Sequence, residues 1–132
     1  MSKAKSIIEA ATFETLNVPA VTNLAPVYQH VPQNTEHRVV VIGDIEAEPF
    51  GTKGSDPDRK AILTIGYLYT GEERKPLHAI QEQVETLLDG KQVQRDGWTL
   101  SFTYLDDGEA RDEERAELYG GISRFTVLAL KD

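Results

Sequence analysis

The stretch that decides the fold is Val27–Glu48, VYQHVPQNTEHRVVVIGDIEAE. It starts with a short extended piece that ends at Pro32, and a polar turn follows at residues 33–37. The next run, Val39–Ile42, consists only of β-branched residues, which is typical of a buried strand. The stretch contains no catalytic constellation, so it predicts a sheet-forming domain without indicating a reaction.

The remainder of the chain adds three strands and a helix. The strands are expected at Ala61–Thr70, Trp98–Leu105 and Leu118–Leu130, where β-branched, aromatic and alternating residues gather. The helix opens at Pro76 and stops before Gly90, the usual start and stop signals. Its apolar residues fall on one face of a helix: Leu77, Ile80, Val84, Leu87 and Leu88.

A second helix is expected near the N-terminus. Ser6 and Glu9 have the spacing of a capping box, which predicts a helix over Ile7–Leu16 that is broken at residues 17–19. The elements together indicate an α+β fold, a mixed or antiparallel sheet of about four strands with two helices packed on one face. At 132 residues the chain, 1–132, is expected to be a single domain.

Two details concern the strand surfaces. Tyr67 and Tyr69 are expected to share one face of their strand, opposite Ile65 and Leu68, and one of these faces is a candidate interface. The glycines at 120–121 predict a bulge or a close backbone approach in the last strand.

Two polar segments supply the candidate interface residues. Residues 47–60 are expected to form a long flexible loop, and residues 106–117 the acidic tip of a hairpin with a net charge of −5. In the first segment Phe50 is the expected anchor, and the basic residues are expected to meet an acidic partner. The predicted interface residues are Phe50, Lys53, Arg59, Lys60, Asp106, Asp107, Glu109, Asp112, Glu113 and Glu114.

Most of the chain resembles the tail-completion or tail-terminator proteins, small tail proteins of long-tailed phages. The resemblance lies in the N-terminal helix, in VYQHVPQNT leading into VVVIGDIEAE, in AILTIGYLYTGEERKPLHAIQEQVETLLDG, and in a final strand that ends FTVLAL. It implies a structural protein and no enzyme: a ring subunit, expected to be part of a hexamer, that caps the tail tube and joins the tail to the head. The implied partners are further copies of the chain, the tail tube protein and the head–tail connector protein. The implied location is the virion, and the host cytoplasm before assembly.

Two alternatives stay open at this point. Within the same particle, the chain could be a neck adaptor or another minor tail protein. From a different class, it could be a small ligand-binding or enzymatic α+β domain. A concave apolar pocket that contains an acid with a shifted pKa would favour this last alternative.

Composition argues against several other classes. The net charge is −8, from 14 basic and 22 acidic residues, which argues against nucleic-acid binding through a basic surface. There is no cysteine, and no apolar run is long enough for a membrane span or a signal peptide. His30, His37 and His78 lack metal-ligand spacing and are expected to be solvent-facing or turn residues.

A calcium loop is also excluded. With Gly108 at the sixth position and Glu114 at the twelfth, Thr103 and Leu105 occupy the first and third positions, where carboxylates are needed. The sequence therefore predicts no catalytic residue, no metal site and no cofactor.

Overall fold

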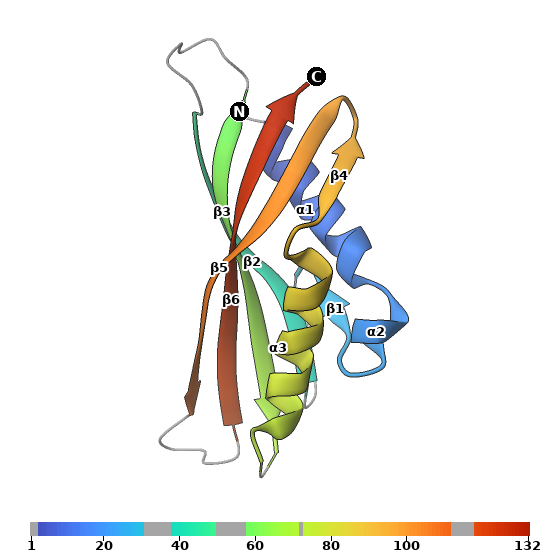
Figure 1. Cartoon of the computed structure of the whole chain (residues 1–132). Helices are drawn as coiled ribbons and strands as arrows, with labels where there is room; N and C mark the ends of the chain where they lie inside the picture. Colours follow the sequence, from blue (N-terminus) through green and yellow to red (C-terminus); the bar gives the residue numbers. More distant parts are fainter. Residues whose placement is uncertain (1–2, 31–37, 50–57, 72, 112–117) are drawn as a thin grey trace.

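A six-stranded, strongly twisted sheet carries all three described helices on one of its faces (Figure 1). The computed structural model describes residues 3–30, 38–49, 58–71, 73–111 and 118–132. The strand order is β1-β2-β3-β6-β5-β4; β1 is parallel to β2 and every other pair is antiparallel. The elements are α1 (Lys3–Leu16), α2 (Pro19–Thr22), β1 (Val27–Tyr28), β2 (Arg38–Pro49), β3 (Arg59–Thr70), α3 (Lys75–Leu88), β4 (Gln92–Arg95), β5 (Trp98–Arg111) and β6 (Leu118–Lys131).

The α+β class is confirmed, and the sheet is of the mixed kind, but the predicted numbers of four strands and two helices are wrong. The sequence prediction missed β4, which pairs with the start of β5 through a two-residue turn at Asp96 and Gly97. Both turn residues have positive φ, 50° and 82°, as the tight turn of a twisted hairpin requires. The one-turn helix α2, which Pro19 opens, was also missed.

The predicted start of the first helix is wrong. The helix α1 begins at Lys3, so Ser6 lies inside it and is not its N-cap. The reason is that the buried face extends one turn further toward the N-terminus, where Ala4 packs fully buried in the same row as Ile8 and Ala11. The predicted end at Leu16 is confirmed.

The predicted boundaries of both polar segments are wrong at their strand ends. Residues 47–49 belong to β2 and residues 59–60 to β3, where Glu48 pairs with Lys60 across the ladder. Likewise β5 continues through Asp106 to Arg111, so the strand covers the first half of the predicted hairpin tip. Polar side chains misled the prediction here because they point to solvent while their backbone groups stay paired. Residues 50–57 and 112–117 lie outside the described part of the chain.

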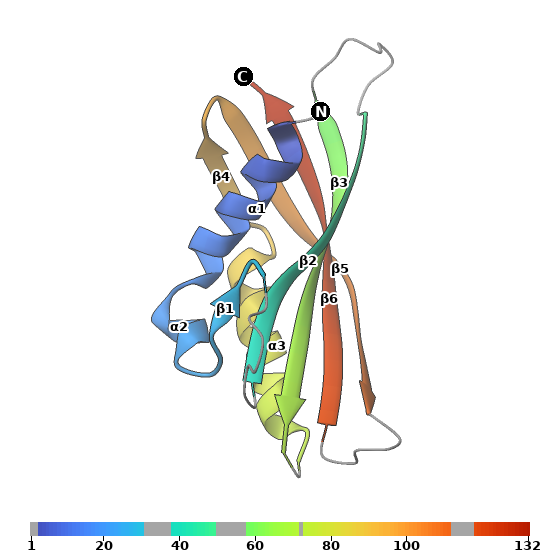
Figure 2. The same cartoon turned by 180° about the vertical axis from the view of Figure 1, so that it is seen from behind.

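The core lies between the sheet and the helices. The helix α1 covers the half of the sheet that contains β4, and α3 covers the half where β5 ends and β6 begins (Figures 1 and 2). Phe102 of β5 and Phe125 of β6 are among the largest fully buried side chains. Tyr67 and Tyr69 do share a face, but Ile65 lies on that same buried face and only Leu68 is opposite, since alternate residues of a strand share a side.

None of the helices described in the structure is long and apolar enough to cross a membrane.

Truncating a large side chain should lower the free energy of unfolding by different amounts on the two faces of the sheet. Phe102→Ala should lower the free energy of unfolding by about 3–5 kcal/mol, because it leaves a cavity in the core beneath the helices. Leu128→Ala, a half-buried position on the opposite face, should cost about 1 kcal/mol. Urea denaturation of both variants measures the difference. Equal losses would contradict the assignment of the core to the helix-covered face.

Candidate interaction surface

A bulge in β5 determines which acidic residues meet the helix α3. Trp98, Leu100 and Phe102 alternate toward the helices and are buried. Tyr104 then pairs with Phe125 and Asp106 with Arg124, so one extra residue, Leu105, interrupts the register. The shift reverses the alternation, and Asp107 and Glu109 turn toward α3 while Asp106 faces the other side.

The predicted acidic surface is therefore divided between the two faces of the sheet. On the outer face, Arg124 makes a two-pronged contact with Asp106: Nε donates to Oδ1 at 2.7 Å and Nη2 to Oδ2 at 2.5 Å. These hydrogen bonds to Arg124 hold the pKa of Asp106 below its usual range. The remaining predicted acids, Asp112, Glu113 and Glu114, lie outside the described residues.

On the helix face, Glu109 receives two side chains from the start of α3. His78 Nε2 lies 2.8 Å from Glu109 Oε2, and Arg74 Nη1 donates to Oε1 at 3.2 Å. His78 is exposed, as is His30, which agrees with the prediction for both; His37 lies outside the described residues. Gln81 Nε2 lies 3.4 Å from the Gly108 carbonyl oxygen and 3.0 Å from where a Cβ on Gly121 would be, so a side chain makes the close approach at Gly121. The bulge predicted at 120–121 is not formed, because β6 keeps its register with both neighbouring strands there.

A chain of hydroxyl and carboxyl groups connects the sheet to the middle of α3. Tyr67 Oη donates to Ser123 Oγ at 2.8 Å, and Ser123 Oγ donates to Glu85 Oε2 at 2.7 Å. Burial raises the pKa of Tyr67. Burial also raises the pKa of Glu85; the Ser123 hydrogen bond offsets part of this rise, and nearby Asp107 adds to it.

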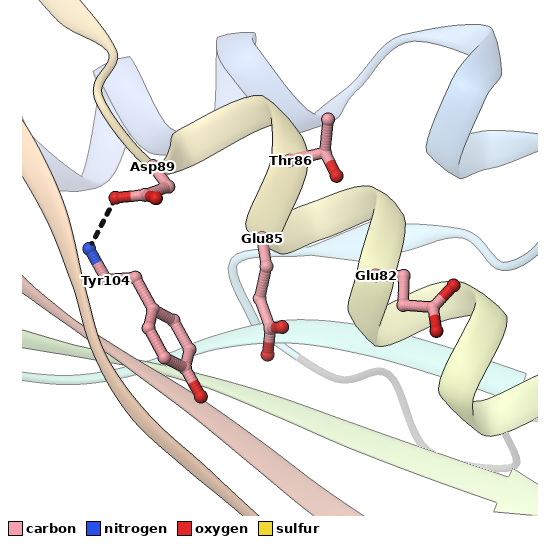
Figure 3. Close-up of a pocket in the computed structure, with 5 residues that line it drawn as sticks. All are labelled: Glu82, Glu85, Thr86, Asp89 and Tyr104. Atoms are coloured by element: carbon pink, nitrogen blue, oxygen red, sulfur yellow. Dashed lines mark hydrogen bonds between the residues drawn. The ribbon is translucent and has the colours of Figure 1, made fainter.

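Tyr104 completes the cluster from the bulged strand. Its hydroxyl donates to Asp107 Oδ2 at 2.7 Å, and this bond raises the pKa of Tyr104 to about 12. Its backbone N–H donates to Asp89 Oδ1, just after the end of α3, at 2.9 Å. The resulting open depression has a volume of about 460 Å³, and Figure 3 shows the side chains that line it. It is lined by Glu82, Glu85, Thr86, Asp89 and Tyr104.

The outer face of the sheet carries a hollow of opposite character. It has a volume of about 610 Å³ and is mostly apolar. Leu68 and Ile122 at its margin are 44% and 41% exposed, although both are large aliphatic residues. Its lining is Val39, Val41, Gly66, Tyr67, Leu68, Glu109, Ala110, Gly120, Gly121 and Ile122.

The predicted basic residues that the structure describes lie at the other end of the sheet from the hollow. Arg59 and Lys60 begin β3 and pair with the end of β2, whereas the hollow lies where β5 ends and the depression lies beside Tyr104 in the middle of β5. Arg59 Nη1 donates to the Asp58 carbonyl oxygen at 2.8 Å. Phe50 and Lys53 lie outside the described residues.

Sequence reasoning missed the polar side of α3. A signal for it existed, because His78, Glu82, Glu85 and Asp89 are spaced 4, 3 and 4 residues apart and so form one stripe along a helix. The partners of this stripe on β5 could not be found in the same way, because the bulge at Leu105 decides which acids face it.

The arrangement offers carboxylates and hydroxyls, but those at the depression lie in an open site that is exposed to solvent. Within the described ranges, no group of three or more histidine or acidic residues is placed to hold a metal ion. The acid with a raised pKa, Glu85, lines the acidic depression, while the apolar hollow lies on the opposite face. The combination that would favour an enzyme or a ligand-binding domain, an apolar pocket around such an acid, is therefore not formed by these two features.

Comparison with known families decides the class of protein. The family described as tail completion protein gp17 matches residues 14–129. The chain belongs to this family. It is thus a structural protein of the phage tail, and the resemblance noted from the sequence is confirmed.

One solved structure shows the same fold in a chain of an assembled particle. A chain of the virion of a native gene transfer agent particle is similar with a TM-score of 0.78 and 19% identity, over 92% of this chain and 93% of that chain. The type 4 fimbrial biogenesis protein PilO from Pseudomonas aeruginosa gives a TM-score of only 0.46 at 8% identity, over 98% and 72% of the two chains. No curated protein matches the sequence.

The raised pKa of Glu85 predicts how stability depends on pH. The folded state binds a proton at Glu85 more tightly than the unfolded state does, so this group's contribution is lost as pH rises through the raised pKa. Glu85→Gln removes the titration and should gain stability relative to the parent as pH rises above the ordinary pKa of a glutamate, by on the order of 0.5 kcal/mol at this partly buried site.

Asp106→Asn is the matched control, with the opposite sign. Its pKa is lowered by Arg124, so its contribution is present at neutral pH and is lost as pH falls. Thermal melts of both variants across the pH range give the two slopes. A Glu85→Gln variant that loses stability relative to the parent as pH rises would contradict the assignment.

Proposed function

We propose that this tail completion protein is the subunit of a ring, a hexamer, that caps the tail tube and joins the tail to the head. Family membership across residues 14–129 is the observation that carries the proposal. Its partners would be further copies of itself, the tail tube protein and the head–tail connector protein, and its place would be the virion. The similar fold in a gene transfer agent virion supports a role in an assembled particle.

The distribution of charge suits such a ring. A net charge of −8 and an acidic depression on α3 and β5 would make an electronegative wall, to which DNA passing through a ring would not adhere. This supports a passage or joining role over a nucleic-acid-binding one. No catalytic step is proposed, because the acidic groups lie in an open depression rather than in an enclosed pocket.

A neck adaptor or another minor tail protein is the second candidate. Both candidates agree with the family, and they differ in what the absence of the protein does to the tube. A cap limits the tube, so its loss leaves a free end to which tube subunits can add. An adaptor leaves tube length unchanged and affects only the union with the head.

Deleting the gene for this protein from the genome that encodes the particle distinguishes the cap from the adaptor. Electron microscopy should show tubes of irregular length that are not joined to heads. Tubes of normal length without heads would favour the adaptor. Normal tails joined to heads would contradict both proposals.

The isolated subunit should associate only weakly, and salt should strengthen the association. Copies with a net charge of −8 repel one another at low ionic strength, and screening removes this repulsion beyond roughly 10 Å at 0.1 M salt. Phe50→Ala should weaken the association further without lowering the melting temperature, because Phe50 is the proposed anchor on a neighbouring copy. Sedimentation velocity at low and high salt measures both effects. A parent protein that is strictly monomeric at every salt concentration and missing from purified tails would contradict the ring.

A further inference from the structure

The hollow on the outer face is formed by side chains and glycines of four neighbouring strands, β2, β3, β6 and β5. Two neighbouring rows of residues cross it, and in each row a large side chain stands beside a glycine. The register gives the rows as Val41, Gly66, Ile122 and Gly108, and as Val39, Leu68, Gly120 and Ala110. The aliphatic side chains form the walls of the hollow, and the glycines, which have no side chain, form its floor. The space above the glycines fits a large apolar side chain.

The backbone does not require glycine at these floor positions. Among the described residues only Gly90 and Gly97 have glycines' positive φ, so Gly66, Gly108 and Gly120 have angles that other residues adopt. At Gly120 the nearest atom to an added Cβ would be the Tyr67 carbonyl oxygen, at 4.0 Å. A β-branched residue would therefore fit and would favour the strand, yet glycine keeps the floor open.

We propose that this hollow receives Phe50, at the β2–β3 end, of a neighbouring copy of the chain. The proposal rests on the ring function proposed above and specifies its contact. Phe50 is the only aromatic residue in the segments outside the described ranges. Residues 31–37 and 112–117, which adjoin the hollow in sequence, offer only Val31, Pro32 and Ala116 as apolar side chains.

The contact must come from another copy because of chain length. Phe50 is bonded to Pro49, so its Cα lies about 3.8 Å from that of the last paired residue of β2. Along β3, the seven steps from Arg59, which pairs with Pro49, to Gly66 span roughly 23 Å. Phe50 therefore cannot reach its own hollow.

The two surfaces lie at opposite ends of the molecule, which makes the contact head-to-tail. In Figure 1, β2 ends and β3 begins at the top, whereas β5 ends and β6 begins at the bottom, near the hollow. A head-to-tail contact between identical copies produces a ring when its rotation closes. Glu109 also lines the hollow, but its carboxylate is paired with Arg74 and His78 on the helix face, so the proposed contact is mainly apolar.

Cysteine cross-linking tests the contact, because the natural chain contains no cysteine. The full-length variant Phe50→Cys/Ile122→Cys is oxidised at high salt and run on a non-reducing gel. We expect a ladder of disulfide-linked multimers that ends at one closed species. The control Phe50→Cys/Gln83→Cys places the second thiol on an exposed position of α3 and should cross-link at least tenfold more slowly.

Equal rates for the two pairs, or no multimers, would overturn the proposed contact. If closed rings are nevertheless seen by electron microscopy, the ring function stands and only the docking site is wrong. Rapid cross-linking of Ile122→Cys to a tube or connector protein in purified tails, in preference to another copy, would also overturn it.

A second variant fills the hollow without touching the inserted end. Gly120→Val should leave the melting temperature unchanged or raised and should weaken self-association at least tenfold. Thr126→Val, on the same strand and the same face but outside the hollow, is the matched control and should associate like the parent. Parent-like association of Gly120→Val would contradict a role for the hollow.

Discussion

The long antiparallel pairing of β5 with β6, shifted once at Leu105, is the constraint on which the other surfaces depend. Before the shift, β5 turns Trp98, Leu100 and Phe102 into the core beneath the helices. After it, the same strand turns Asp107 and Glu109 toward α3 and leaves Asp106, Gly108 and Ala110 on the outer face. One inserted residue thus divides β5 into two parts. The first part buries large side chains in the core, and the second part has acidic side chains on the helix face and mostly small residues on the outer face.

The acidic depression and the apolar hollow lie on opposite faces of the sheet, and this separation favours a structural role over a catalytic one. The acidic side is held by specific hydrogen bonds, from Tyr67 through Ser123 to Glu85 and from Tyr104 to Asp107. These bonds fix α3 on the sheet and leave a charged, open depression. The outer side leaves Leu68 and Ile122 exposed around glycine, which is costly for a free monomer and useful for a subunit that is covered in an assembly.

Hydrophobic pattern was sufficient to predict the elements that form the core. The strands at 61–70 and 118–130 and the helix after Pro76 follow from unbroken periodicity, and the structure places them within a few residues. The pattern failed where polar strand residues face solvent, as at Glu48 and Lys60, because backbone pairing leaves no trace in composition. It also failed at β4, although Asp96-Gly97 is a strong hairpin signal that could have been used.

The interaction surface was less predictable than the fold. Ser123 and Glu85 are 38 residues apart and Tyr67 and Ser123 are 56 apart, so only the folded sheet brings them together. The outer hollow likewise depends on the registration of four strands. The most direct test of a head-to-tail ring is a cryo-electron microscopy map of the tail end. It should show a closed ring of this chain in which each outer hollow is filled by the β2–β3 end of the next copy. A map in which the ring leaves the hollow facing solvent, or in which a single copy is present, would contradict this assembly.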